Sequence, residues 1–192
     1  MGSLLGAVGL LSASALPISK PRDFQDATDN AFLKQIVLTV NAVRARHGVP
    51  PVRLDDNLTK YAKSRLLEVS QGHRLGKGHK GLRSRTGEVL YWASASRKPS
   101  GSVDARNAVD RWYAEVSDYD FNSAGFSART GHFTQLVWKE STRIGAARAV
   151  GGKPGHYERY IAVEFENPGN LVGEFKQNVF PVKRHRHGSS RR

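Results

Sequence analysis

The most constraining feature of this 192-residue sequence is the order in which two kinds of apolar spacing appear along it. Apolar residues recur at helical spacing in three segments before Ser117, and short β-like runs come after them. Strands that follow one another directly pair most simply as antiparallel hairpins, whereas alternating βαβ units would favour a parallel sheet. The order therefore predicts an α+β layered domain built on an antiparallel sheet.

Three helices are expected, each with a capping residue before its apolar stripe. The first follows Asp29 or Asn30, and the second follows Asp55 or Asp56. The third follows Ser102. Their inward-facing stripes are Phe32, Ile36, Val37, Val40 and Val43, then Leu58, Tyr61, Ala62 and Leu66, then Ala105, Ala108, Val109, Trp112 and Val116.

Three β-like runs are expected in the C-terminal half, at residues 133–138, 143–150 and 160–166. Glycines and a proline in residues 151–155 predict the turn between the last two. A short apolar run at 89–93 fits either a strand or a turn of helix.

The two ends differ in composition from the body of the chain. Residues 4–16 are apolar and small, which is the length of a signal-peptide core and too short to span a bilayer. A myristoyl anchor on Gly2 is disfavoured because Gly6 stands where that motif has Ser or Thr. We therefore expect a signal peptide over 1–15, a linker over 16–29, the domain over 30–182 and a basic disordered tail over 183–192.

The chain is strongly basic and has no cysteine. Thirty Lys and Arg residues against seventeen Asp and Glu give a net charge of +13, concentrated partly in the tail and partly in residues 73–85. Such a surface favours anionic partners, although a solvated basic surface with no dedicated partner is the other interpretation. No specific nucleic-acid binding is expected, because the basic segments lack interleaved aromatic residues. Without cysteine, disulfides and thiolate zinc sites are excluded.

Motif patterns exclude several enzyme classes. The sequence has no phosphate-binding GxxxxGK[ST] loop, no GxGxxG after a strand, no HExxH helix and no GxSxG elbow. The remaining candidates are histidines and glutamates near loops, namely His79, Glu88, Glu115 and His132. Two imidazoles with carboxylates suit either a divalent metal or an acid–base pair. Spacing alone does not bring them together, and solvated loop histidines are the alternative.

Five segments, in order, resemble the CAP superfamily, which contains the cysteine-rich secretory, antigen 5 and pathogenesis-related proteins and is also called the SCP domain. The segments are RARHGVPPVRLDDNL (44–58), GEVLYWAS (87–94), VDRWYAEVSDYDF (109–121), GHFTQLVWKESTRIGAA (131–147) and YIAVEFENPGNLVGEF (160–175). The sequence looks most similar to the Golgi-associated pathogenesis-related type and to secreted fungal members.

The resemblance implies a three-layer α-β-α sandwich with a central antiparallel sheet and a cavity lined by two His and two Glu. Carried onto this chain, the cavity residues are His79, Glu88, Glu115 and His132, with His73 as the alternative to His79. In the family the two histidines hold Zn²⁺ or another divalent ion, which we do not expect folding to require.

The segment 131–138 is interpreted as the entry to a strand. In that interpretation it places His132 at the cavity, while Phe133 and Trp138 anchor the strand in the core.

The resemblance further implies a secreted, extracellular protein that binds a sterol, a fatty-acid-like lipid or an anionic membrane surface, as a monomer or weak homodimer. Tyr119, Phe121 and Phe126 form the candidate lipid-binding loop, and ordinary packing over the sheet is the alternative. A protease-like, metal-assisted hydrolase is the competing function. Binding is favoured because no nucleophile motif is present. Asn57 begins a glycosylation sequon, which matters only if the chain is secreted.

Overall fold

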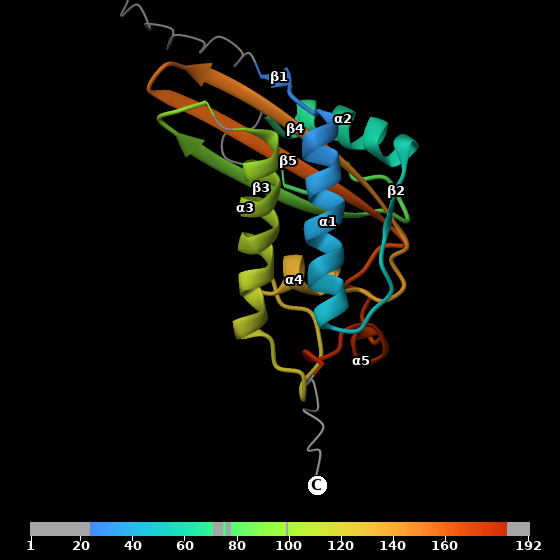
Figure 1. The fold of residues 1–192 in the computed structure, drawn as a ribbon. Helices are drawn as coiled ribbons and strands as arrows, with labels where there is room; N and C mark the ends of the chain where they lie inside the picture. Colours follow the sequence, from blue (N-terminus) through green and yellow to red (C-terminus); the bar gives the residue numbers. More distant parts are fainter. Residues whose placement is uncertain (1–23, 71–74, 76–77, 99, 184–192) are drawn as a thin grey trace, which may run out of the picture.

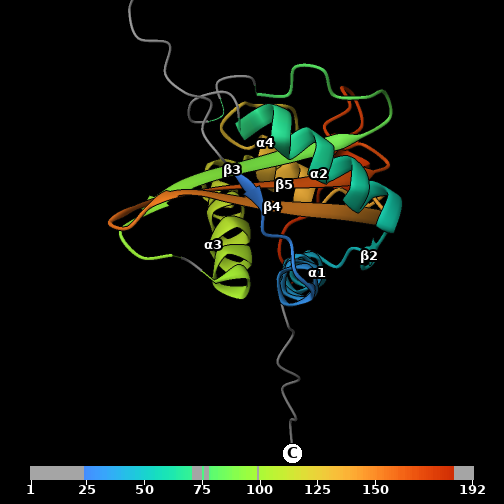
Figure 2. The same cartoon turned by 90° about the horizontal axis from the view of Figure 1, so that it is seen from above.

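The computed structural model describes residues 24–70, 75, 78–98 and 100–183. They form three layers, with helix α2 (Asp56–Ser70) on one face of a central sheet and helices α1 (Asn30–Arg46) and α3 (Gly101–Tyr113) on the other (Figure 1). Figure 2 shows the same layers from above, with α2 on one side of the strands and α1 and α3 on the opposite side. The predicted α-β-α sandwich is confirmed.

The central sheet is antiparallel apart from one short strand. Its order is β1 (Gln25–Asp26), β4 (Arg143–Lys153), β5 (His156–Glu166) and β3 (Gly87–Ala95), and β2 (Arg53–Leu54) pairs with β4 in parallel. The hairpin of β4 and β5 turns within the predicted glycine-rich segment. The ambiguous run at 89–93 is part of strand β3, at the edge of the described sheet.

The first two predicted caps are confirmed, and the third is wrong. Asp29 accepts a hydrogen bond from the backbone N–H of Phe32 at the start of α1, and Asp55 accepts one from Leu58 at the start of α2. Helix α3 begins at Gly101, so Ser102 lies inside its first turn and does not cap it.

Both faces of the sheet carry apolar packing. The α1 and α3 stripes pack with the sheet in the larger cluster, while Ala62 and Leu66 of α2 pack with Tyr160 in the smaller one. Val37, Tyr61 and Val116 are only partly buried. The glycine at 145 permits the close approach of α2, because a Cβ there would overlap the backbone of Leu58.

The prediction of a strand over 133–138 is wrong. Residues Gly131–Leu136 form the short helix α4, on the same side of the sheet as α1 and α3 (Figure 1). The other part of the interpretation is confirmed, since Phe133 and Trp138 are fully buried.

The predicted boundary between linker and domain lies too late in the chain. Phe24 is buried against Tyr160, with ring centroids 4.9 Å apart, and β1 extends the sheet beside β4. The predicted signal peptide, the linker up to residue 23 and residues 184–192 of the tail lie outside the described residues. Within the described part of the chain, no helix is long and apolar enough to cross a bilayer.

Candidate functional site

A cleft of about 340 Å³ brings both predicted histidines to one surface. It lies where the loop before β3, the start of β3, the start of α4 and the turn after β5 meet. Its lining residues are His79, Leu82, Thr86, Gly87, Glu88, Phe126, Ala128, Gly131, His132, Gln135, Pro168, Gly169 and Asn170. Three of the four predicted cavity residues therefore line one cleft, and Glu115 reaches it through His132.

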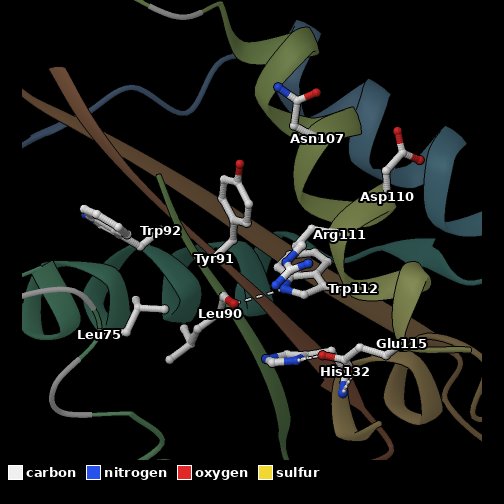
Figure 3. Close-up of a pocket in the computed structure, with 10 residues that line it drawn as sticks. All are labelled: Leu75, Leu90, Tyr91, Trp92, Asn107, Asp110, Arg111, Trp112, Glu115 and His132. Carbon is white, nitrogen blue, oxygen red and sulfur yellow. Dashed lines mark hydrogen bonds and ion pairs between the residues drawn. The ribbon is translucent and has the colours of Figure 1, made fainter. Parts of the chain in front are cut away.

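His132 lies at the start of α4 and is paired with Glu115, which follows α3 in the 3₁₀ segment Ala114–Asp118 (η2). Its Nδ1 is 2.6 Å from Glu115 Oε1, and the two side chains face one another in Figure 3. The imidazole also stacks near the indole of Trp112, with centroids 6.4 Å apart and planes 18° from parallel. These contacts hold the ring in one orientation and leave its Nε2 as the nitrogen available to a ligand.

The same Glu115 also stabilises the start of helix α4. Its Oε2 accepts the backbone N–H groups of His132 (3.0 Å) and Phe133 (3.1 Å). A helix leaves its first N–H groups without internal partners, so a carboxylate at this end satisfies them and complements the helix dipole. The cap comes from seventeen residues earlier in the chain, which is why no local motif revealed it.

His79 is held differently, by a carboxylate that belongs to the sheet. Its Nδ1 lies 2.9 Å from Oε1 of Glu88, the second residue of β3. The Glu88 carboxylate is fully buried and also accepts two hydrogen bonds from Arg65 of α2, at 3.0 and 3.1 Å. The imidazole itself is about half exposed, with 53% of its side-chain surface accessible.

Arg65 is a site residue that the sequence analysis missed. Its guanidinium donates to the carbonyl oxygens of Lys80 and Gly78, so it fastens the loop that carries His79 as well as Glu88. Its position in the sequence could have indicated its role. Arg65 lies seven residues after Leu58 and three after Ala62, on the inward-facing stripe of α2. A charge on an apolar stripe predicts a buried partner.

The buried carboxyl groups have opposite pKa shifts. Burial raises the pKa of Glu88, but the hydrogen bonds from His79 and Arg65 outweigh burial and hold it below its ordinary value. Glu164, opposite Glu88 across β3 and β5, is fully buried. Burial and the nearby negative charge of Glu88 raise the pKa of Glu164 to about 9, so Glu164 is a neutral acid at pH 7.

The predicted lipid-binding loop divides into a buried part and an exposed part. Tyr119 is buried and Phe121 is partly buried, and both pack edge-on against Phe133 with centroids 5.5 and 6.2 Å away. Phe126, in contrast, is 61% exposed and lines the cleft beside Gly131. Of the three predicted residues, only Phe126 presents a broad apolar surface to a ligand.

Two other predicted residues, His73 and Asn57, do not line the cleft as described. His73, the alternative to His79, lies outside the described residues. Asn57 is exposed in the first turn of α2, while the hydroxyl-bearing Thr59 of its sequon is buried. The glycosylation of Asn57 stays a prediction.

The cleft offers the imidazoles of His79 and His132 as metal donors. Each imidazole has its Nδ1 on a carboxylate, which is the arrangement that orients histidine ligands in zinc sites. The described residues contain no cluster of three or more His, Cys, Asp or Glu placed to hold an ion. Any ion would thus need oxygen atoms from solvent or from a ligand in addition to the imidazoles.

Several known proteins resemble this chain in sequence. The model of the cysteine-rich secretory protein family, CAP, matches residues 37–165. The chain is 31% identical over 155 residues to the human Golgi-associated plant pathogenesis-related protein 1, covering 80% of this chain and 95% of the human protein. It is 31% identical over 171 residues to Repressed by EFG1 protein 1 of Candida albicans, covering 85% of this chain but 59% of that relative.

Solved structures match in fold. NaASP2, whose structure was determined with Zn²⁺, aligns with a TM-score of 0.60 at 16% identity, over 86% of this chain and 90% of that one. The hookworm platelet inhibitor aligns with a TM-score of 0.59 at 12% identity, over 85% and 83% of the two chains. At such identities the likeness is one of fold alone.

Proposed function

Because this chain belongs to the cysteine-rich secretory protein (CAP) family, we propose that it is a lipid-binding domain whose cleft also holds a divalent metal ion. The observation that carries the proposal is that the cleft lined by His79 and His132 has Phe126 exposed at its rim. A sterol or a fatty-acid-like lipid combines an apolar body with one polar end. Such a ligand can place its apolar body against Phe126 and its polar end near the imidazoles of His79 and His132.

The metal would be held by His79 and His132 through their Nε2 atoms. Glu88 and Glu115 hold the other ring nitrogen of each, so they fix which nitrogen carries a proton. A bound ion would supply a positive charge that attracts the polar group of the ligand. Since NaASP2 was determined with Zn²⁺, zinc is the first ion to test.

We further propose that the protein acts outside the cell or along the secretory pathway. The expected signal peptide supports this location, and the relatives include Secreted protein RBT4 of Candida albicans and the human Golgi-associated protein. The basic composition favours contact with an anionic membrane surface.

Zinc binding is tested by calorimetry on the full chain at about pH 7.5. The wild-type protein should bind one Zn²⁺, and His79→Ala with His132→Ala should abolish uptake. His156→Ala is the matched control, because His156 is an exposed histidine that also contacts a glutamate, Glu158, away from the cleft. Equal uptake by the wild type and the double variant would refute the metal site.

Lipid binding is tested with a fluorescent cholesterol analogue and with a labelled fatty acid. Phe126→Ser should weaken binding at least about tenfold, since it removes a large apolar contact. Val103→Ser is the control, because Val103 is also exposed and lies on α3 away from the cleft. Unchanged binding in Phe126→Ser would contradict the proposed ligand position.

The competing function, a metal-assisted hydrolase, would use the same histidines and glutamates. Among the described residues that line the cleft, Thr86 is the one with a hydroxyl side chain. Its oxygen accepts a hydrogen bond from Arg83. Peptide hydrolysis that is abolished by Glu115→Gln in a folded protein would favour the hydrolase over the binding domain.

A further inference from the structure

A second and larger groove, of about 590 Å³, lies between strand β3 and helix α3. Figure 3 shows its lining side chains, with Tyr91 and Trp92 projecting from the strand and Asn107, Asp110 and Arg111 from the helix. It shares one lining residue, His132, with the cleft described above. The proposed lipid and metal function leaves this groove without a role.

The helical wall of the groove is a row of polar side chains. Asn107, Asp110 and Arg111 are spaced three and four residues apart, so they lie on one face of α3. All three are exposed, and among the described residues none of their side chains forms a hydrogen bond or an ion pair. Their donors and acceptors are therefore available to a ligand.

The remaining lining of the groove is largely aromatic and continues around the edge of β3. Tyr91 lies on the face of β3 that packs with Trp112, whereas Trp92 lies on the opposite face with Leu75 and Leu90. Tyr91 and Trp92 are partly buried, and Trp112 is buried. The Tyr91 and Trp112 rings meet edge to face at 6.4 Å, and the Trp92 indole N–H is held by Glu158 at 3.1 Å. The rings are thus fixed before any ligand arrives, which reduces the entropy lost on binding.

The groove does not suit an extended peptide that would add a strand to the sheet. Strand β3 is the edge of the described sheet, and its Leu90 carbonyl accepts a hydrogen bond from the Trp112 indole at 2.9 Å. Trp112 belongs to α3, so this carbonyl points away from β5 and its pairing position is already taken. A ligand here must be recognised by side chains.

We propose that this groove binds a neutral saccharide. The apolar C–H face of a sugar ring packs on an aromatic face, while paired hydroxyls match the adjacent donors and acceptors of amide, carboxylate and guanidinium groups. Asp110 and Arg111 are adjacent and opposite in charge, so the polar row has no net charge that would select a phosphate or sulfate. The volume of the groove lies within the range of small-molecule binding pockets.

The proposal is tested with the full chain and four neutral hexasaccharides: cellohexaose, chitohexaose, laminarihexaose and α-1,6-mannohexaose. Each is titrated up to about 5 mM while tryptophan fluorescence is followed, because two indoles line the groove. At least one sugar should bind saturably. Asn107→Ala with Asp110→Ala should weaken that binding about tenfold, and Tyr91→Ala should do so by a similar factor.

Two controls keep the result specific to the groove. Arg106→Ala alters an exposed residue of α3 that does not line it, and the affinity should stay unchanged. Asn107 and Asp110 are exposed, so the double variant should unfold at the wild-type temperature even if Tyr91→Ala does not.

Three results would overturn the proposal: no binding of any of the four sugars, equal affinity in the Asn107 and Asp110 double variant, or binding of a sulfated polysaccharide alone that disappears with added salt. The last would indicate non-specific attraction to a chain of net charge +13. His79→Ala should leave sugar binding intact, which separates this groove from the metal site.

Discussion

The two histidine–glutamate pairs of the cleft look equivalent in the sequence but are built in different ways. In the His79 pair the glutamate is the fixed partner, because Glu88 is buried in the sheet and clamped by Arg65, whereas its histidine lies on a loop. In the His132 pair both partners are partly exposed, and the histidine, 33% exposed, lies in the first turn of helix α4. Its Glu115 lies at 21% exposure in the 3₁₀ segment.

In each pair the glutamate has two roles, one in the fold and one in orienting the histidine. Glu88 neutralises the buried Arg65 and also orients His79, so its loss should damage the fold as well as the site. Glu115 caps α4 and orients His132, and it contributes to stability mainly through backbone hydrogen bonds. Measured free energies of unfolding can test this asymmetry.

The largest effect is expected for Glu88→Ala. It leaves the Arg65 guanidinium, 3% exposed, without its main counter-charge, and breaking a buried pair costs about 3 kcal/mol of unfolding free energy. Chemical denaturation measures this loss. Glu68→Ala is the matched control, because Glu68 also contacts Arg65 at 3.0 Å but is 62% exposed, and it should cost less than about 0.5 kcal/mol. Equal losses in the two variants would show that Glu88 is not the anchor.

The second prediction concerns pH, and it applies to the Glu88 side alone. The buried Glu164 keeps its proton up to about pH 9, whereas in the unfolded chain it loses the proton near 4.5, the ordinary pKa of a glutamate. Between these values the native state binds more protons, so this residue makes stability fall as pH rises. Glu164→Gln should remove that fall, so the variant should gain stability relative to the wild type as the pH rises from 5 to 8.

Denaturation curves collected across this pH range provide the measurement for Glu164. Two proteins whose stabilities change in parallel with pH would contradict the neutral state of the buried acid.

The smallest effect is expected for Glu115→Ala. Removing two hydrogen bonds from the first turn of a six-residue helix should cost about 1 kcal/mol and loosen His132. The change is measured by denaturation and by hydrogen exchange of the amides of His132 and Phe133. Asp118→Ala, an exposed acid in the same 3₁₀ segment, should change neither. Unaltered exchange in Glu115→Ala would mean that this carboxylate does not cap α4.

Much of the fold could be predicted because its information is local. The caps Asp29 and Asp55 contact residues three positions away, and the β4–β5 hairpin turns at its own glycines. The positions of Glu88, Glu115 and His132 were predicted from family motifs, whereas their contacts were not.

Tertiary structure alone decided the features that depend on distant partners. The segment after Thr130 is apolar enough for a strand, but it forms a helix whose first amides are bound by the distant Glu115. Tyr119 and Phe121 pack against Phe133, whereas Phe126 is the aromatic residue of the loop that is exposed.

By itself the sequence determined which segments are helical or extended over most of the chain, and which residue types were available for a site. The tertiary structure decided that Arg65 pairs with Glu88 and that Glu164 stays neutral beside it. The physical reason is that a buried polar group needs a partner or a proton, and both depend on neighbours that only the folded chain brings together.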